Sequence, residues 1–507
     1  MQGSLLCECE PVQRSGDEGA DMGRRMVLNA GAAAALTVPL LLATPASAAT
    51  GPTVAHVGQI AAQNVAPQPG SEPDTLVEPD IAVSPLNKNV AVAASHDGRF
   101  PDGGAVGILY ASTSDGGRTW QSSALPDLTV ATGGIWDRAS DPVVAFGPDG
   151  SVYISTLVFD LGCPSGVAVS RSTDGGRTFA APVLVNDSQD CAFSDDKNWL
   201  VADTSARSAH AGRLYQFWTA FLTNPDGTSG GSPQVVSWSD DHGQTWSPYV
   251  TVTAPHANTQ NSQPVLKADG TITDTYLDSG PGGSAEGPEH HGKVQAATTA
   301  PSTTTTTTKP TGSTPLVATT SHDGGRTWSP QVLVTTDVGD GPKGVRCCLD
   351  SVTQDPTTGR FYAAWDSADP TRVRLSSSSD GATWSAPVTV NNDSSASLDH
   401  VNVDVSAYGG SVYVSYGTRD IKVANGRYVQ QQLSTSTDGG ATFGPAQNLG
   451  PLSDLKYAAF AFGDFPGDYM GSAATAGRLY EAWCLSSQPI DKSAKYHQVL
   501  YAAALNT

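Results

Sequence analysis

The sequence has few charged residues, and few of those are basic. Charged side chains make up 15% of its 507 residues, and 28 Lys and Arg stand against 49 Asp and Glu, for a formal net charge of −21. A chain this acidic repels phosphate backbones and anionic membrane surfaces, so we expect no nucleic-acid partner. The many Ser, Thr and Gly residues favour short strands and turns over long helices.

Long hydrophobic runs are almost absent too. The longest, Ala30 to Leu42, has 13 residues, which is short of the ~20 that a membrane-spanning helix needs. Arg24 and Arg25 precede it, and the small residues 46–48 follow it. These are the parts of a secretory signal peptide, and the arginine pair suggests the twin-arginine route. A membrane anchor is the alternative.

We therefore expect residues 1–48 to be a signal peptide, with 1–21 an artefact of an upstream start. Residues 49–74 form an N-terminal segment, and 75–507 the main domain. The mature protein is expected to be secreted and monomeric, with no membrane span.

Cysteine is scarce. The chain has seven, and two of them precede the expected cleavage site. The remaining five are an odd number, so at least one thiol stays unpaired within a monomer. We expect a disulfide between Cys163 and Cys191, whereas Cys347 and Cys348 could join each other or reach Cys484. Zinc binding is less favoured because no CxxC spacing is present.

What the sequence does have is a repeated octet. It first reads TSDGGRTW, at residues 113–120, and its pattern is Ser/Thr-x-Asp-x-Gly-x-Thr-Trp/Phe. The further copies span residues 172–179, 239–246, 321–328, 436–443 and, one residue shorter, 378–384. Such an aspartate accepts hydrogen bonds in a turn, glycine supplies positive φ, and the aromatic ring packs between sheets.

The octet resembles the Asp-box of the sialidase superfamily, and the resemblance covers about residues 75–505. It implies a β-propeller in which the box aspartates shape turns and take no part in catalysis. These aspartates are Asp115, Asp174, Asp241, Asp323, Asp380 and Asp438.

The spacing of the boxes predicts an all-β propeller of four-stranded blades. Three of the intervals between successive box aspartates are 57 to 59 residues, which is the length of one blade with its loops. Seven strand triplets predict seven blades, with six as the alternative. The last triplet lacks a fourth strand, which residues 53–60 could supply to close the ring. The Gly-, Ser- and Thr-rich stretch 279–312 reads as a disordered insertion.

Polar residues stand where each blade's first strand begins, and in a propeller these positions converge on one funnel. Converging carboxylates with a few cations suit glycosidic acid–base chemistry, but they equally suit a Ca²⁺ site. We expect catalytic roles for Asp141, Asp350, Tyr469 and Glu78, and substrate binding by Arg138, Arg346, His400, Asp196, Lys197 and Gln263. Asp141 and Asp350 are chosen as acid/base residues because each enters a strand beside an arginine.

The resemblance also implies a catalytic apparatus: three arginines that hold a carboxylate, an aspartate acid/base, and a tyrosine nucleophile assisted by glutamate. The slot of the first arginine here reads Glu78-Pro79-Asp80. Carboxylates replace the cation there, which should repel a sialic acid. Arg99 begins a similar triplet, but one strand too late. Arg138, Arg346 and Arg419 could rebuild the cluster, and Tyr469 could serve as the nucleophile.

The sequence thus favours a secreted glycoside hydrolase of sialidase-like fold that acts on extracellular glycans or glycoconjugates. A non-catalytic propeller that binds glycans or cell walls is the first alternative, and a protein-interaction propeller is the second. No cofactor is required by this interpretation, although Ca²⁺ remains open and no metal ligand set is defined.

Overall fold

The computed structural model describes residues 51–280, 314–492 and 494–507. The expected signal peptide and nearly all of the expected insertion lie outside them. Within these ranges the fold is all-β, and helix is limited to three 3-10 turns, η1 (Val130–Thr132), η2 (Ala424–Gly426) and η3 (Leu455–Tyr457). No described helix has the length and apolar character needed to cross a membrane.

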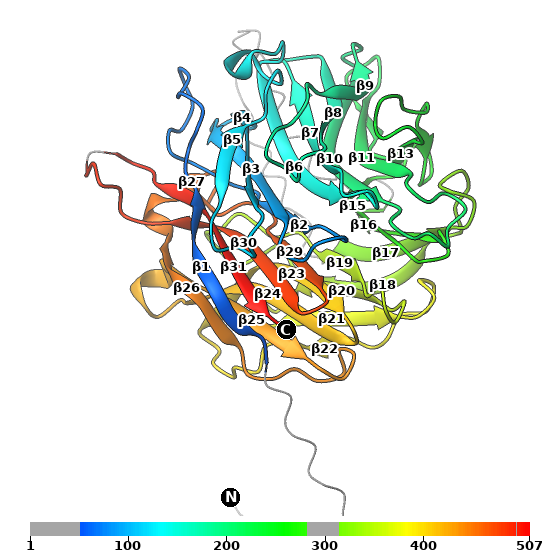
Figure 1. Cartoon of the computed structure of the whole chain (residues 1–507). Coiled ribbons are helices and arrows are strands. Elements are labelled where there is room, and N and C mark those ends of the chain that lie inside the picture. Colours follow the sequence, from blue (N-terminus) through cyan, green and yellow to red (C-terminus); the bar gives the residue numbers. More distant parts are fainter. Residues whose placement is uncertain (1–50, 281–313, 493) are drawn as a thin grey trace, which may run out of the picture. The chain divides into compact units, whose positions relative to one another are not determined.

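The strands form four-stranded antiparallel groups, joined in sequence order (Figure 1). The first two groups are β2 (Asp80–Val83), β3 (Ala91–Arg99), β4 (Ala105–Thr113) and β5 (Gln121–Ala124), then β6 (Arg138–Phe146), β7 (Val152–Phe159), β8 (Ser165–Ser172) and β9 (Val183–Ser188). One residue pair, Ala105 with Ala139, joins these two groups into a single larger sheet.

Three more groups follow along the chain. They are β10 (Phe193–Ala202), β11 (Leu214–Thr223), β13 (Gln234–Ser239) and β14 (Val250–Thr251), with β12 (Ser229–Gly231) beside β11; β15 (Thr259–Leu266), β16 (Ile272–Asp278), β17 (Thr314–Ser321) and β18 (Val332–Val338); and β19 (Ser351–Gln354), β20 (Phe361–Asp366), β21 (Val373–Ser378) and β22 (Val388–Thr389).

The last groups bring the two ends of the main domain together. They are β23 (Leu398–Tyr408), β24 (Ser411–Asp420), β25 (Tyr428–Ser436) and β26 (Gln447–Asp454), then β29 (Gly471–Thr475), β30 (Arg478–Ser486), β31 (Gln498–Asn506) and β1 (Thr53–Ala61). β1 pairs with β31, which is the position expected for residues 53–60. A short hairpin, β27 (Ala459–Phe460) with β28 (Asp464–Phe465), stands between them.

The first strands of the groups contact one another in a closed circle. β2 contacts β6, each later first strand contacts the next, and β29 contacts β2; their labels gather at the middle of Figure 1. A channel of about 560 Å³ is lined by residues from these strands, including Asp80, Val143 and Trp199. The first strands therefore surround a common axis.

The core consists of apolar layers between successive groups. One layer joins the β2 and β6 groups, and another joins the β2 and β29 groups across the two ends of the chain. The octet aromatics lie in these layers: Phe179 packs on Tyr110 with ring centroids 4.7 Å apart, and Trp120 lies beside Tyr480. Hydrophobic alternation along a strand would not predict these layers, because strands such as β4 and β7 are buried on both faces.

Each octet forms a turn between the third and fourth strands of its group. In the copy at 172–179, Asp174 Oδ1 accepts hydrogen bonds from the backbone N–H groups of Arg177 and Thr178, at 2.9 and 3.0 Å. Gly176 has φ 82°, and an added Cβ there would lie 2.3 Å from a Val92 methyl. These turns lie at the opposite end of the sheets from the entries of the first strands, which separates them from the predicted site.

Replacing Asp174 with alanine should therefore weaken the fold and spare the function. Losing its hydrogen bonds should lower the free energy of unfolding by about 1–3 kcal/mol. Denaturant melts of purified Asp174→Ala would measure this change, and ligand binding or turnover per folded molecule should equal that of wild type. Lost function at unchanged stability would contradict a structural role.

The cysteines are arranged as two pairs and one thiol. Cys163 and Cys191 form the expected disulfide, with Cα atoms 5.4 Å apart. Cys347 and Cys348 are joined to each other, which resolves the alternative that the sequence left open. Cys484 is a buried free thiol.

Candidate functional site

The entries of the first strands share an unusual backbone conformation. Four of the first strands shift register there, as β-bulges do. Five non-glycine residues at these entries have positive φ: Glu78 (54°), Asp141 (50°), Lys197 (44°), Asn261 (63°) and Asn402 (51°). Bulges re-aim side chains, and strained non-glycine residues gather at functional sites. The repeated bulge is thus the local reason why polar side chains from different groups converge.

Glu78, His96 and Asp141, which we call the acidic centre, lie closest together. One ligand atom from each lies within 4.8 Å of the other two. His96 Nε2 is 3.0 Å from Glu78 Oε2 and 4.0 Å from Asp141 Oδ1. All three residues are buried, with 2 to 6% of their surface exposed. His96 was not among the residues expected at the site, because it lies within β3 and not at a strand entry.

His96 is a neutral hydrogen-bond acceptor in this centre. The backbone N–H of Asp141 donates to its Nε2 at 2.9 Å, so we assign the ring proton to Nδ1. Burial lowers the pKa of His96 to about 4. Glu78 Oε2 has no hydrogen-bond partner among the described residues. Because Glu78 Oε2 lies only 3.0 Å from His96 Nε2, a proton shared between these two atoms would satisfy both.

Asp141 is suited to hold a proton near neutral pH. Burial raises its pKa to about 6, and the charge of Glu78 adds to the effect. The hydroxyl of Ser140 donates to its Oδ1 at 2.7 Å. The charge of Lys197 opposes this effect, whereas Arg138, the arginine near Asp141 in the sequence, pairs with Asp102.

Lys197 brings a buried cation to the same place. Its ammonium lies 3.5 Å from the centroid of the Tyr469 ring and 4.8 Å from that of Trp199. Nζ has no hydrogen-bond partner within the described ranges. Burial lowers the pKa of Lys197, against the opposing effect of Asp141 and Glu78. Cation–π contact and nearby carboxylates thus replace the water that this ammonium has lost.

Tyr469 lies beside the acidic centre but is not set up as a nucleophile. Its hydroxyl donates to the carbonyl oxygen of Pro142 at 3.4 Å. Burial raises the pKa of Tyr469 well above its ordinary value, and the charges of Glu78 and Asp141 raise it further. These surroundings disfavour the phenolate that would attack a sugar.

Asp350, Gln263 and Asp196 hold neighbouring strands together. Asp350 Oδ1 accepts from the side chain of Asn261 at 2.7 Å, and burial raises the pKa of Asp350 to about 7. Gln263 bonds the carbonyl of Asp350 and the N–H of Val352. Asp196 accepts from the Gln260 side chain at 3.2 Å, and burial raises its pKa well above its ordinary value.

The arginines proposed as a cluster are each engaged by an aspartate. Arg138 pairs with Asp102 at 2.8 Å, Arg346 with Asp468 at 2.7 Å, and Arg419 with Asp399 at 3.2 Å. The Arg346–Asp468 pair is partly open to solvent, with side chains 16% and 19% exposed. The side chain of Asp350, the acid/base candidate that follows Arg346 in the sequence, accepts from Asn261.

Arg99 begins the triplet that lies one strand later than the sialidase pattern requires. It is buried, lies 3.4 Å from Glu72, and stacks on Phe465 at 4.9 Å from the ring centroid. Arg346 lies at the same distance from that ring. The order of the strands does not indicate that Arg99 and Arg346 share the Phe465 ring, because this contact depends on a hairpin far along the chain.

His400 belongs to a different network. Its ring is fully buried, its Nε2 lies 3.0 Å from the Asn391 side chain, and its Nδ1 lies 3.1 Å from the Thr418 hydroxyl. Thr418 is on β24, the second strand of the same group, and Asn391 follows β22, the last strand of the preceding group. The structure thus offers no support for His400 as a ligand-binding residue.

A calcium ion does not fit the acidic centre. The three residues offer two carboxylates and one imidazole, whose Nε2 already accepts the Asp141 N–H. Ca²⁺ takes six to eight oxygen ligands. The donor set supports acid–base chemistry better than it supports metal binding.

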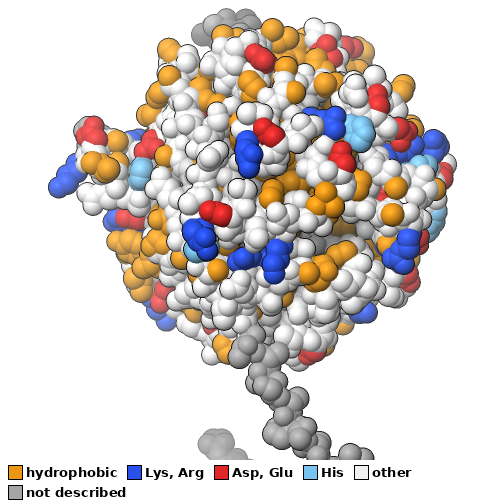
Figure 2. All heavy atoms as spheres, in the orientation of Figure 1, with side chains coloured by type: hydrophobic (Ala, Val, Ile, Leu, Met, Phe, Trp, Pro, Cys, Tyr) orange, Lys and Arg blue, Asp and Glu red, His pale blue; other side chains and the backbone are white. Residues whose placement is uncertain are grey.

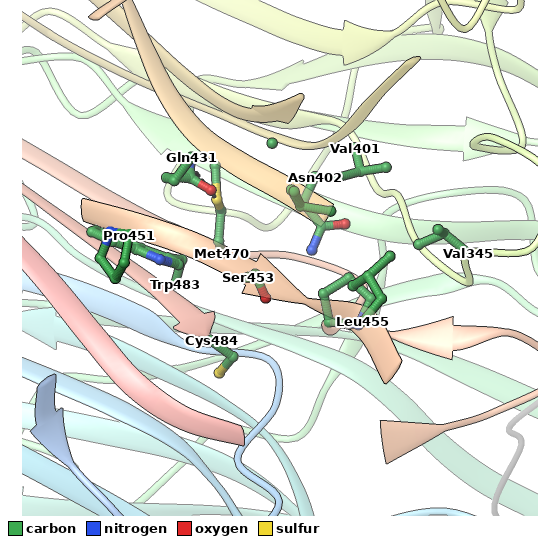
Figure 3. A pocket seen from close by; sticks show the side chains of 13 residues that line it. Val345, Val401, Asn402, Gln431, Pro451, Ser453, Leu455, Met470, Trp483 and Cys484 are labelled. Atoms are coloured by element: carbon green, nitrogen blue, oxygen red, sulfur yellow. Dashed lines mark hydrogen bonds between the residues drawn. The ribbon is translucent and has the colours of Figure 1, made fainter. Parts of the chain in front are cut away.

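A small cavity lies beside the site, between the β23 and β29 groups (Figure 3). Its volume is about 30 Å³, enough for about one or two water molecules. Its walls are mostly apolar, with Met470, Trp483 and Cys484 on one side. The side-chain oxygen of Asn402 is buried there without a hydrogen-bond partner.

The buried carboxyls predict an unusual pH dependence of stability. Burial raises the pKa of Asp274 and of Glu481 to about 8, whereas hydrogen bonds in the exposed octet turns outweigh desolvation and lower that of Asp174 to about 2. Because the pKa values of Asp274 and Glu481 are raised, their contribution to stability is lost as pH rises from about 4 through 8. Because the pKa of Asp174 is lowered, its contribution to stability is lost as pH falls below about 4. Melting temperature should peak near pH 4–5. Asp274→Asn should flatten the alkaline decline, and a melting temperature that rises steadily to pH 8 would contradict this.

Comparison with known proteins adds a resemblance to sialidases. No family model matches the sequence. A sialidase of Micromonospora viridifaciens is 28% identical over 249 residues, which cover 41% of this chain and 36% of that protein. The chain thus matches about a third of the length of this curated relative.

Solved structures with a similar chain trace include two glycan-active enzymes. The leech intramolecular trans-sialidase is 13% identical, with 79% of this chain and 70% of that one covered and a TM-score of 0.45. The α-L-arabinanase of Penicillium chrysogenum is 14% identical, with 79% and 99% covered and a TM-score of 0.45. The chain resembles the sialidase superfamily, as its octets indicated.

Proposed function

We propose that the protein is a secreted glycoside hydrolase that acts on extracellular glycans. The observation that carries this proposal is the pair of buried carboxyls, Glu78 and Asp141, whose oxygens lie within 4.8 Å of each other across a neutral His96. The similarity to a bacterial sialidase supports action on glycans. The function rests on this centre because propellers as such host many activities.

The proposed reaction uses the two carboxyls in different protonation states. Asp141 gives its proton to the oxygen of the leaving group, and Glu78 attacks the anomeric carbon as the glycosidic bond breaks. Water then splits the resulting glycosyl ester while Asp141 takes back a proton. One oxygen from each carboxyl lies within 4.8 Å of the other, which is closer than the roughly 6.5–9.5 Å of inverting glycosidases, so we expect the anomeric configuration to be retained.

The charges of the site favour a reacting sugar without a carboxylate. Arg138, Arg346 and Arg419 each face an aspartate. A carboxylate on the sugar would also meet Glu78 and Asp141. We therefore propose a neutral sugar in place of the sialic acid that the resemblance implies.

The architecture proposed with this function is a seven-bladed propeller with Asp-box turns. It is supported by the closed circle of first strands from β2 to β29 and by the matching turn bonds of the octets, such as those of Asp115 and Asp438. Charged side chains of both signs are scattered over the face seen in Figure 2, without a large patch of either. No observation favours a protein-interaction propeller over a glycan-active one.

A screen of the purified protein against chromogenic glycosides tests the proposal. Neutral hexosides, pentosides and sialosides should be compared, each with and without EDTA. We expect turnover of a neutral glycoside that EDTA leaves unchanged. Turnover of sialosides alone would overturn the proposed substrate, and glycan binding without any turnover would point to the non-catalytic alternative.

A further inference from the structure

The hairpin formed by residues 459–465, here called the aromatic hairpin, presents two phenylalanines to solvent. Phe462 is 93% exposed and Phe460 is 54% exposed. Single exposed apolar residues are ordinary on a protein surface. Two large aromatic rings on one seven-residue hairpin beside a candidate active site call for an explanation.

The backbone of Phe462 is strained as well. Its φ is 59°, in the left-handed region, where a bulky residue is a genuine outlier and glycine is at ease. The N–H of Ala461 donates to the carbonyl of Gly463 across this residue at 3.0 Å. The fold therefore places an exposed aromatic residue at a backbone conformation in which glycine would be more stable.

The hairpin is anchored beside two arginines, Arg99 and Arg346. Its base is buried, with Ala459 at 0% and Phe465 at 2% exposure. The N–H of Arg346 donates to the carbonyl of Asp464 at 3.0 Å, and the Arg346 side chain pairs with Asp468. The Arg99 guanidinium contacts the carbonyl of Phe460 at 3.4 Å. The hairpin that carries the two rings is thus bonded to Arg346, whose ion pair with Asp468 is partly open to solvent.

We propose that Phe462, with Phe460, is a platform on which a further sugar unit of the glycan stacks, beyond the bond that is cleaved. The C–H groups on the face of a sugar ring carry slight positive charge, and the face of an aromatic ring is negative. A chain that leaves the site past the Arg346–Asp468 pair meets these rings. The substrate class is accordingly an oligomeric glycan, and this inference rests on the proposed function.

The test compares Phe462→Ala with wild type on substrates of increasing length. The substrates are the chromogenic monosaccharide that wild type cleaves best and its oligomers of two to four units. Loss of one stacking contact should raise KM for the oligomers about three- to tenfold and leave kcat/KM for the monosaccharide unchanged. Phe462→Trp should restore oligomer KM.

Two further variants separate stacking from folding. Phe462→Gly removes the ring but suits the left-handed backbone, so it should show the same oligomer defect with a melting temperature no lower than that of wild type. Leu86→Ala removes a side chain that is 67% exposed, in a turn at the opposite end of the sheets, and should leave oligomer KM unchanged.

The outcomes distinguish this inference from the proposed function. Equal oligomer KM for wild type and Phe462→Ala, in an active enzyme, would overturn the platform alone. If wild type cleaves no glycoside, the proposed function fails, and loss of binding to an oligosaccharide array in Phe462→Ala would still support the platform. Normal glycan binding combined with lost vesicle binding in Phe462→Ala would assign the rings to a membrane surface instead.

Discussion

Replacing Asp141 with asparagine is expected to lower kcat for the cleaved glycoside by about 10²–10⁴-fold, the usual contribution of a general acid. The amide keeps the size of the carboxyl but has no proton to give to the leaving oxygen. Glycan binding should persist, because Glu78, Lys197 and the Phe462 platform remain. Steady-state kinetics together with calorimetric titration of an uncleaved oligomer would measure both quantities.

The pH dependence of kcat/KM tests the role of Asp141 independently. Burial raises the pKa of Asp141 to about 6, and a general acid must be protonated. Wild-type kcat/KM should therefore fall as pH rises through about 6, and this limb should be missing from the residual activity of Asp141→Asn.

Asp195→Asn is the matched control for this substitution. Burial raises the pKa of Asp195 to about 6 as well, but its carboxylate accepts from Ser165 and Asn186, away from the acidic centre. Its kcat should equal that of wild type. Equal losses in the two variants would contradict the assignment of Asp141 and indicate a general loss of folding.

Replacing Glu78 should cause a loss of similar size, about 10²–10⁴-fold, by removing the nucleophile. Glycine is the informative choice, because Glu78 has φ 54° and glycine tolerates that conformation. Azide added to Glu78→Gly should restore cleavage and yield a glycosyl azide of inverted configuration, since the small anion enters from the side of the missing carboxylate. Product analysis by NMR would identify it.

Tyr469→Phe tests the competing nucleophile that the resemblance to sialidases implies. The phenol faces the Pro142 carbonyl, and burial raises its pKa, so this variant should keep most of its kcat. If Tyr469→Phe is inactive while Glu78→Gly retains activity, tyrosine is the nucleophile and the assignment of Glu78 is wrong.

Local patterns predicted much of the candidate site. Glu78, Asp141 and Lys197 were found because polar residues recur at the starts of the first strands, and the structure brings these three together. Burial is the larger cause of the raised pKa of Asp141, and the like charge of Glu78 adds to it. The depth at which a side chain is buried depends on how the groups of strands close around the axis, so a short sequence motif cannot predict it.

Other site residues could not be predicted in this way. His96 stands inside β3, and Arg99 at its end meets Arg346 only through Phe465, more than 360 residues away in the chain. His400 matched the strand-entry pattern, yet its ring is held by Asn391 and Thr418. The pattern specifies which residue enters a strand, and packing decides which way its side chain points.

The sequence by itself determined the all-β class of the fold and the repeated octet turns, because both depend on local spacing and on chemistry that recurs along the chain. Only the tertiary structure decided which carboxyls are buried together, which arginines are already engaged, and that Phe462 is exposed on a hairpin bonded to Arg346. These features arise where strands from opposite ends of the chain meet around one axis. Desolvation and ion pairing there depend on three-dimensional neighbours that no segment specifies alone.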